Sequence, residues 1–310
     1  MKNSKKMIKE NVKENPIMNY SPLRYPGGKS KLTPFVKLLL NRSKITHPIY
    51  VEPFAGGAGV ALALLFDGTV EEIVINDSDK AIYSMWKAIL TQTNDFVDLI
   101  RTTPVNVDEW KKQKEIYFNN RKKYSLELGF SAFFLNRTNR SGIISKAGPI
   151  GGLNQNGNYS IDVRFNKEDL IRRIRKIAEY KNKIHLYNQD AKVFITKYLP
   201  KYINNAFVYF DPPYYSKGKD LYQNFYTAPD HKDIYDLIKN LNCPWIVTYD
   251  DVPEIREIYS AHSAKLYDLV YSLANSGINS EIMVLSDKKM WPTKKMLEEC
   301  GLKINLRRLK

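Results

Sequence analysis

Short apolar runs that alternate with helical patterns constrain the fold of this chain more than any other feature. The runs span residues 49–51, 73–75, 184–187, 206–210, 245–248 and 282–285. Each has the length of a strand buried on both faces, and Ile234, Ile238 and Leu241 have the spacing of an amphipathic helix between two of them. This alternation predicts an α/β fold with a mostly parallel central sheet and helices on both faces.

The run at 206–210 ends in Asp211-Pro212-Pro213-Tyr214, which combines a carboxylate, a stiff turn and an aromatic ring. Proline fixes φ and has no N–H, so the turn is rigid and its carbonyls can accept hydrogen bonds. Asp211 and the Pro212 carbonyl can then accept both hydrogens of an exocyclic amine while Tyr214 stacks on the ring that bears it. Such a pocket suits an adenine or a cytosine turned out of a helix. The competing interpretation is a strand that ends in an ordinary proline turn.

A glycine-rich turn lies upstream of that pocket. Residues 49–51 lead through the turn 52–59 into an apolar run at 60–66. Glycine has no Cβ, so the backbone of such a turn can approach a ligand at a sheet edge. The next apolar run ends at Asn76-Asp77, and an acid about 20 residues beyond a glycine turn is placed to hold a ribose hydroxyl. The turn and the acid together predict a nucleotide-like ligand.

Three other kinds of site do not fit the sequence. Gly27-Gly28-Lys29-Ser30 resembles the end of a P-loop, but Leu23 stands where that motif needs a glycine. A zinc deaminase needs His-x-Glu and Cys-x-x-Cys, whereas Cys243 and Cys300 are isolated, so we expect no metal site. Cys243 lies in an apolar, strand-like stretch, which favours a buried inert thiol over a nucleophile.

The motifs occur in an order that resembles a known family. They are Leu23-Arg24-Tyr25-Pro26-Gly27-Gly28-Lys29, Pro53-Phe54-Ala55-Gly56, Asn76-Asp77, a long insert, Asp190 and Asp211-Pro212-Pro213-Tyr214. From roughly Ser21 to Ser286, the chain resembles the Dam-like, alpha-ordered N6-adenine DNA methyltransferases, which use S-adenosylmethionine. The resemblance implies a Rossmann-like methyltransferase fold. It also implies a site-specific, adenine-specific DNA methyltransferase that methylates the N6 amino group of a flipped adenine.

The resemblance, carried over residue by residue, also implies the site. The cofactor-binding residues are Tyr25, Lys29, Phe54, Gly56, Asp77 on the ribose, Asp190 near the cofactor adenine, and Asp211. The catalytic residues are Asp211, Pro212 and Tyr214. Ala58 takes the place of the last glycine in the family's Phe-x-Gly-x-Gly pattern, which leaves the register of this turn open by one residue. An acid such as Asp190 after a strand is also typical of a helix cap.

The chain is expected to divide into three parts. Residues 1–19 form a basic arm, 20–92 and 184–310 form the catalytic domain, and 93–183 form an inserted target-recognition domain. The insert has helical patterns at 109–123 and 126–135, and its polar stretch 136–158 matches the place of the family's target-recognition β-hairpin. Guanidinium, amide and hydroxyl groups there can contact phosphates or base edges. The expected DNA-binding residues are Arg137, Asn139, Arg140, Ser141, Ser145 and Lys146.

Composition agrees with a nucleic-acid partner. The 310-residue chain has a net charge of +15, which favours double-stranded DNA, with a solvated basic surface as the alternative. It has no apolar run long enough to cross a membrane, it begins with polar residues, and its cysteines form no disulfide framework. We therefore expect a cytoplasmic protein with no membrane partner, and we also expect a monomer. A cognate restriction endonuclease is a further partner compatible with the resemblance.

Two alternative functions stay open at this stage. An RNA or protein-amide methyltransferase uses a related box on another planar amine, but protein-glutamine enzymes resemble this chain with asparagine in place of Asp211. The aspartate and the basic insert therefore favour DNA adenine. A catalytically silent DNA-binding subunit would have a broken box or a broken glycine turn, and both are intact here.

The insert departs from the Dam members that recognise GATC. Those enzymes carry a guanine-reading arginine eight residues after the arginine matched by Arg137, and Ser145 stands there. Serine is too short for a bidentate guanine contact. The aromatic that the family inserts into the duplex is replaced by Arg140, and the asparagine after it by Ser141. The sequence predicts a target other than GATC, or a guanine contact made by Arg140 or Lys146 from another backbone path.

Overall fold

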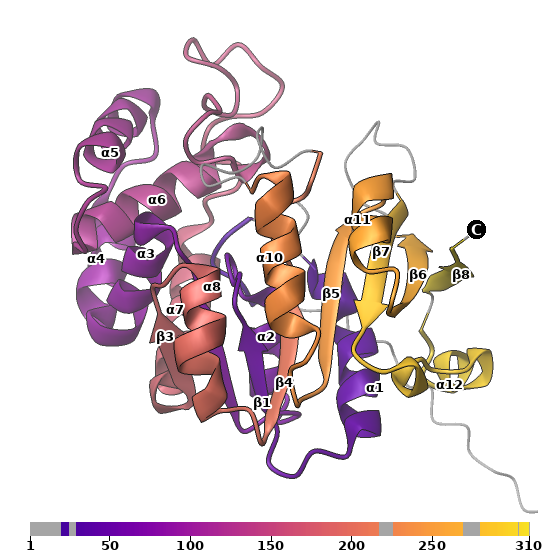
Figure 1. Cartoon of the computed structure of the whole chain (residues 1–310). Coiled ribbons are helices and arrows are strands. Elements are labelled where there is room, and N and C mark those ends of the chain that lie inside the picture. The colour runs from indigo at the N-terminus through magenta and orange to yellow at the C-terminus, as the bar shows by residue number, and fades with distance from the viewer. Residues whose placement is uncertain (1–19, 25–28, 217–225, 269–279, 303, 310) are drawn as a thin grey trace, which may run out of the picture.

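The centre of the molecule is an eight-stranded sheet in the order β3-β2-β1-β4-β5-β7-β6-β8 (Figure 1). The computed structural model describes residues 20–24, 29–216, 226–268, 280–302 and 304–309. The strands are β1 (Ile49–Glu52), β2 (Glu72–Asn76), β3 (Ile184–Tyr187), β4 (Ala206–Phe210), β5 (Trp245–Asp250), β6 (Ser263–Asp268), β7 (Ser280–Leu285) and β8 (Asn305–Arg308). The first five strands in the order are parallel, β7 is antiparallel to β5 and β6, and β8 is antiparallel to β6. The predicted α/β fold with a mostly parallel sheet is confirmed.

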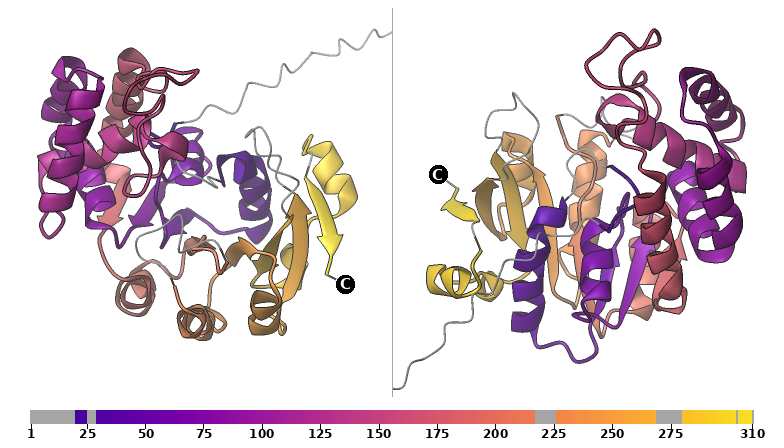
Figure 2. Two further views of the ribbon diagram at one scale, coloured as in Figure 1. Left: turned by 90° about the horizontal axis from the view of Figure 1, so that it is seen from above. Right: turned by 180° about the vertical axis from the view of Figure 1, so that it is seen from behind.

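Helices cover both faces of this sheet, as the view along the strands shows (Figure 2). One face carries α1 (Thr33–Ser43), α2 (Gly59–Phe66) and α3 (Lys80–Thr91), and the other carries α8 (Ala191–Val193), α10 (Ala228–Ile238) and α11 (Pro253–Ile258). Strand side chains alternate between the two cores: in β2, Ile73 and Ile75 enter the first core and Val74 enters the second. None of the described helices combines the length and apolarity needed to span a bilayer.

The strand register brings the predicted motifs to one edge of the sheet. Glu52 pairs with Ile75, and Val51 pairs with Val208. The glycine turn after β1, Asp77 after β2 and Asp211 after β4 therefore follow neighbouring carboxyl ends of parallel strands. Ligands of open α/β sheets bind at such an edge.

The insert between α3 and β3 is mainly helical and is anchored on α3. Its helices are α4 (Thr93–Thr102), α5 (Val107–Asn119), α6 (Leu126–Thr138) and α7 (Lys167–Glu179). The short helix α12 (Lys294–Glu299) is not part of the insert and lies near the C-terminus. Gly129 lets α6 approach α3, because a Cβ at that position would lie 2.6 Å from the carbonyl carbon of Ser84. The Phe165 ring then packs on Phe133 and Phe134, with ring centroids 5.6 and 5.4 Å apart. The segment after α6 therefore follows a helix that packs closely against α3 and Phe165.

The structure corrects one expectation about the fold and adds two strands. The stretch after α6 forms turns rather than a β-hairpin, with a single antiparallel bridge between Asn139 and Pro149. Strands β6 and β8 were not predicted from the sequence. Arg307 lies in β8 and donates from Nη2 to Asp268 Oδ1 at 2.6 Å.

Candidate active site

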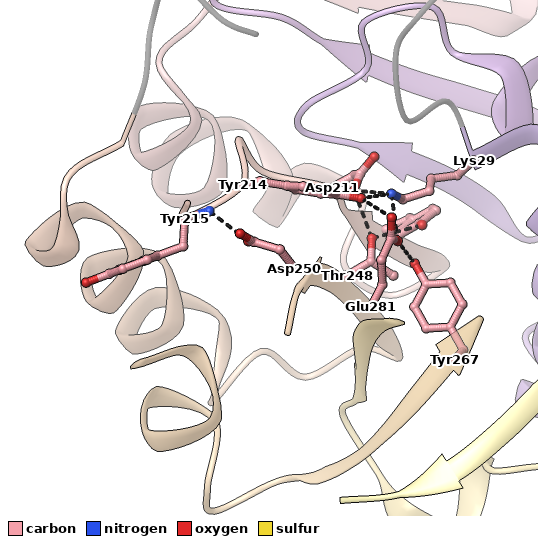
Figure 3. Close-up of polar contacts among 9 residues, drawn as sticks. Lys29, Asp211, Tyr214, Tyr215, Thr248, Asp250, Tyr267 and Glu281 are labelled. Atoms are coloured by element: carbon pink, nitrogen blue, oxygen red, sulfur yellow. Dashed lines mark hydrogen bonds and ion pairs between the residues drawn. The ribbon is translucent and has the colours of Figure 1, made fainter. Parts of the chain in front are cut away.

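Asp211 meets a buried lysine and a second carboxylate where β4 ends (Figure 3). Lys29, in the 3-10 helix Lys29–Leu32, is 6% exposed, and Glu281 on β7 is 3% exposed. Lys29 Nζ lies 3.5 Å from Asp211 Oδ1 and 3.0 Å from Glu281 Oε2. Thr248 on β5 donates from its hydroxyl to Asp211 Oδ1 at 2.8 Å. An ion pair and a hydroxyl thus orient the Asp211 carboxylate.

The Tyr214 ring is fixed by the same group of residues. Its hydroxyl donates to Glu281 Oε1 at 2.6 Å and accepts a hydrogen bond from Lys29 Nζ. The ammonium of Lys29 also lies 4.8 Å from the centroid of the Tyr214 ring, within range of a cation–π contact. Tyr267 of β6 donates its hydroxyl to Glu281 Oε2. The ring that the sequence assigns to base stacking is therefore held at its hydroxyl end.

Burial and neighbouring charges perturb the carboxyl groups at this edge. Desolvation raises the pKa of Asp211, the Glu281 charge raises it further, and Lys29 and the Thr248 hydroxyl oppose the rise. Desolvation also raises the pKa of Glu52, at the end of β1, to about 8, and the charge of Asp211 adds to that rise. Repulsion between these carboxylates favours their neutral forms. The positive charge of Lys29 acts in the opposite direction and favours the ionised form of Asp211.

The glycine turn and Asp77 are joined by hydrogen bonds. Asp77 accepts from Gly56 N through Oδ2 and from Asp79 N through Oδ1, both at 2.9 Å. Trp86 Nε1 donates to Gly56 O at 2.9 Å and holds the turn from the other side. Burial, followed by the charge of Asp79, raises the pKa of Asp77 to about 7. Further hydrogen-bond donors would stabilise the ionised form of the half-buried Asp77 carboxylate. The hydroxyl groups of a ribose are such donors.

The structure gives weaker support for the other residues that were expected to bind the cofactor. Ala58 has a φ of 45°, a left-handed conformation that glycine adopts more easily, which favours its match to the last glycine of the family's pattern. Phe54 packs edge-on against Tyr226, with ring centroids 5.9 Å apart. Asp190 accepts from Lys192 N at 2.8 Å as the N-cap of α8. Tyr25 lies outside the described residues.

Comparison with known proteins decides the family. A model described as the D12 class of N6 adenine-specific DNA methyltransferases matches residues 25–273. The chain belongs to this family. A type II methyltransferase, M.MjaIII of Methanocaldococcus jannaschii, is 25% identical over 227 residues, which cover 68% of this chain and 74% of that protein.

Two solved structures are also similar to this D12 methyltransferase. The rRNA methyltransferase aviRa of Streptomyces viridochromogenes is 12% identical, with 82% of each chain covered and a TM-score of 0.37. A putative class I S-adenosylmethionine-dependent methyltransferase of Listeria monocytogenes is 12% identical, with 85% of this chain and 62% of that chain covered and a TM-score of 0.36.

Membership confirms several expectations from the sequence. This D12 protein is an adenine-specific DNA methyltransferase that uses S-adenosylmethionine, and DNA is its substrate. The RNA, protein-amide and silent-subunit alternatives are therefore not retained.

A cysteine nucleophile is also disfavoured by the structure, because burial raises the pKa of Cys243 to about 12. Across the described ranges, no group of three His, Cys, Asp or Glu side chains is arranged to hold a metal ion.

The residues expected to contact DNA divide by burial. Arg137 and Asn139 are 8% and 0% exposed. Arg137 Nε donates to Arg164 O at 2.8 Å, and Asn139 Oδ1 accepts from Trp110 Nε1 at 2.6 Å. These two assignments are corrected: both side chains bond within the insert, so we do not retain them as DNA contacts. Of the others, Arg140, Ser141 and Lys146 are exposed and Ser145 is half-buried.

Sequence reasoning missed three polar residues of this D12 site. Thr248 contacts Asp211, and Glu281 contacts Tyr214 and Lys29, as described above. Asn136 accepts from Arg24 N at 2.7 Å and donates to Arg24 O at 2.9 Å and to Gly142 O at 2.8 Å. It therefore ties the turn after α6 to the N-terminal motif that carries Lys29. Only Glu281 gave a usable signal, as a lone charge directly before the apolar run 282–285.

Proposed function

We propose that Asp211, Pro212 and Tyr214 form the pocket in which this enzyme methylates a flipped adenine. The observation that carries the proposal is the fixed Asp211 carboxylate, which Lys29 and Thr248 both contact through Oδ1. We propose that the second oxygen, Oδ2, accepts from the substrate amine. Pro212 follows Asp211 in a turn whose carbonyl orientation is restricted by proline.

The adenine amino group needs help to act as a nucleophile, because its lone pair is delocalised into the ring. When Asp211 and the Pro212 carbonyl accept both N–H hydrogens, they favour a pyramidal nitrogen and stabilise its developing positive charge. N6 then forms a bond to the methyl carbon as the carbon–sulfur bond breaks, and one N6 proton leaves afterwards to Asp211 or water. Placing the N6 amino group in line with the methyl group would lower the barrier to methyl transfer further.

We propose that S-adenosylmethionine, which supplies an electrophilic methyl group, is held along the glycine turn. Asp77 would bind its ribose and Gly56 would lie under its methionine part, with Phe54 and Lys29 beside them. The half-buried Asp77 carboxylate, with its raised pKa, supports this assignment. The assignments of Tyr25, Asp190 and Asp211 to the cofactor stay predictions.

We propose that the exposed side chains after α6 read the DNA. Arg140, Ser141 and Lys146 are exposed on a turn that Asn136 and Asn139 hold from within. A phosphate contact made by Arg140 or Lys146 would release about one counterion, so Arg140→Gln and Lys146→Gln should each flatten the salt dependence of DNA binding by up to about one unit of slope. Titrations at several salt concentrations measure this slope.

Arg172→Gln is the matched control for that experiment. Arg172 is an exposed arginine of α7 that pairs with Asp169, and its removal should leave the slope unchanged. Equal slopes for the wild type and both turn variants would move the DNA surface elsewhere.

The target sequence is expected to differ from GATC, because Ser145 stands where the Dam members carry their guanine-reading arginine. Single-molecule sequencing of DNA from cells that express the protein identifies the methylated motif. We expect a motif other than GATC, and we expect Arg140→Ala to lose or relax it. Methylation confined to GATC would show that the specificity is not altered.

The partner and the assembly state are also proposed. We propose that the enzyme acts as a cytoplasmic monomer and that it protects DNA against a cognate restriction endonuclease. The relative M.MjaIII, named as a type II methyltransferase, supports the endonuclease. Light scattering of the purified protein tests the monomer, and loss of DNA from cells that lack only the methyltransferase gene tests the endonuclease.

A further inference from the structure

Glu281 is a buried carboxylate in an otherwise apolar strand. Its neighbours along β7 are Ile282, Met283 and Val284, which are all fully buried. A buried charge is costly unless it is paired and hydrogen-bonded. Nothing in the packing of β7 requires a charge at this position, so the reason for Glu281 lies in what its carboxylate contacts.

The Glu281 carboxylate joins both halves of the catalytic pocket (Figure 3). Oε1 accepts from the Tyr214 hydroxyl at 2.6 Å, and Oε2 lies 3.0 Å from Lys29 Nζ. Oε2 also accepts the Tyr267 hydroxyl. Lys29 in turn contacts Asp211, the group proposed to accept from the adenine amine. One side chain therefore holds the stacking ring and the lysine that pairs with the acid.

We propose that Glu281 is a positioning residue, which fixes Lys29 and the Tyr214 ring so that Asp211 and the stacking surface are in place before the adenine enters. This inference rests on the proposed roles of Asp211 and Tyr214. Without Glu281, Lys29 has Asp211 as its neighbouring carboxylate and draws closer to it, in competition with the substrate amine. The Tyr214 hydroxyl also loses the hydrogen bond that it donates to Glu281 Oε1, so the stacking orientation of its ring is held less firmly.

The charges around Asp211 give this inference a measurable consequence. Asp211 is faced by Lys29 from the N-terminal motif, Glu281 from β7 and Glu52 from β1. The Thr248 hydroxyl of β5, itself bonded to the Tyr209 hydroxyl at 3.0 Å, also contacts Asp211, and the Tyr50 and Tyr209 hydroxyls interact with it electrostatically. Lys29 lowers the pKa of Asp211 and Glu281 raises it. Because ionised Asp211 is the form that accepts from the amine, activity should fall at acid pH as this group protonates.

The test compares the pH dependence of kcat/KM in Glu281→Gln and Lys29→Met. Glu281→Gln removes a negative charge, lowers the pKa of Asp211 and should move the acid limb to lower pH. Lys29→Met removes a positive charge, raises that pKa and should move the limb to higher pH, with each shift up to about one pH unit. Glu254→Gln, an exposed glutamate of α11, is the control and should leave the profile unchanged.

Lys29→Met alone leaves two neighbouring carboxylates without the cation between them, so one of them should take up a proton more readily. Adding Glu281→Gln removes that repulsion, and the double variant should recover about tenfold of the activity lost at pH 7 in Lys29→Met. A purely structural role for Glu281 predicts the opposite, a further loss in the double variant.

The possible results separate this inference from the proposed function. Shifts of the acid limb in opposite directions, with recovery in the double variant, support the positioning role. Shifts in the same direction, or none, in an enzyme that still depends on Asp211 would overturn it. Full activity in Asp211→Ala would instead overturn the proposed catalytic pocket itself.

Discussion

Asp211→Ala is expected to lower the methyl-transfer rate by at least about a hundredfold, because it removes a preorganised acceptor from the charge that develops on N6. DNA affinity should stay within about threefold, since the carboxylate contacts the amine and not the phosphate backbone. Single-turnover kinetics on DNA that carries the target motif measure the rate, and a binding titration on the same DNA measures the affinity.

A matched acid outside the pocket serves as the control. Asp251, which follows β5 and bonds Arg256 at 2.7 Å, is partly buried at the same end of the sheet. Asp251→Ala should keep the wild-type rate. The proposed mechanism would be wrong if Asp211→Ala kept most of the turnover, or if both variants lost it equally.

Asp77→Ala is expected to weaken S-adenosylmethionine binding by about tenfold or more, because hydrogen bonds to a charged group contribute about 1.5–3 kcal/mol. Calorimetry in the absence of DNA measures this affinity. In the wild type this affinity should fall as the pH falls below about 7, because the raised pKa of Asp77 means that its carboxylate protonates in that range, and the difference from Asp77→Ala should shrink there.

Asp79→Ala is the control for the cofactor experiment. Asp79 is a neighbouring half-buried acid that caps α3 by accepting from Ala81 N at 2.8 Å, so its loss should lower stability more than cofactor affinity. Normal cofactor binding by a folded Asp77→Ala protein would show that the ribose assignment is wrong.

Local patterns predicted the parts of the site that lie within one segment. The box that begins at Asp211 and the glycine turn around Gly56 each follow a buried strand directly, so strand, turn and side chain could be predicted together. The contacts of Thr248 and Glu281 depend instead on the pairing of β4, β5 and β7. Asp250 lies opposite Glu281 in the antiparallel β5–β7 pair, and no local pattern specifies this long-range register.

The turn after α6 was predicted less well, because the helix before it is longer than expected. The pattern predicted helix over 126–135, but α6 continues to Thr138. Arg137 thus lies in the last turn of a helix with its side chain directed inward, although polar composition indicated a loop that faces DNA. Strands β6 and β8 were missed because charged residues such as Lys265 and Arg307 interrupt their apolar pattern.

The most direct test of the account uses methyl-labelled S-adenosylmethionine and unmodified DNA. The purified protein is incubated with both, the DNA is digested, and the nucleosides are separated. The account predicts that the label appears in N6-methyldeoxyadenosine, and that Asp211→Ala removes it while DNA binding remains. Label in a cytosine nucleoside, or undiminished adenine label in Asp211→Ala, would contradict it.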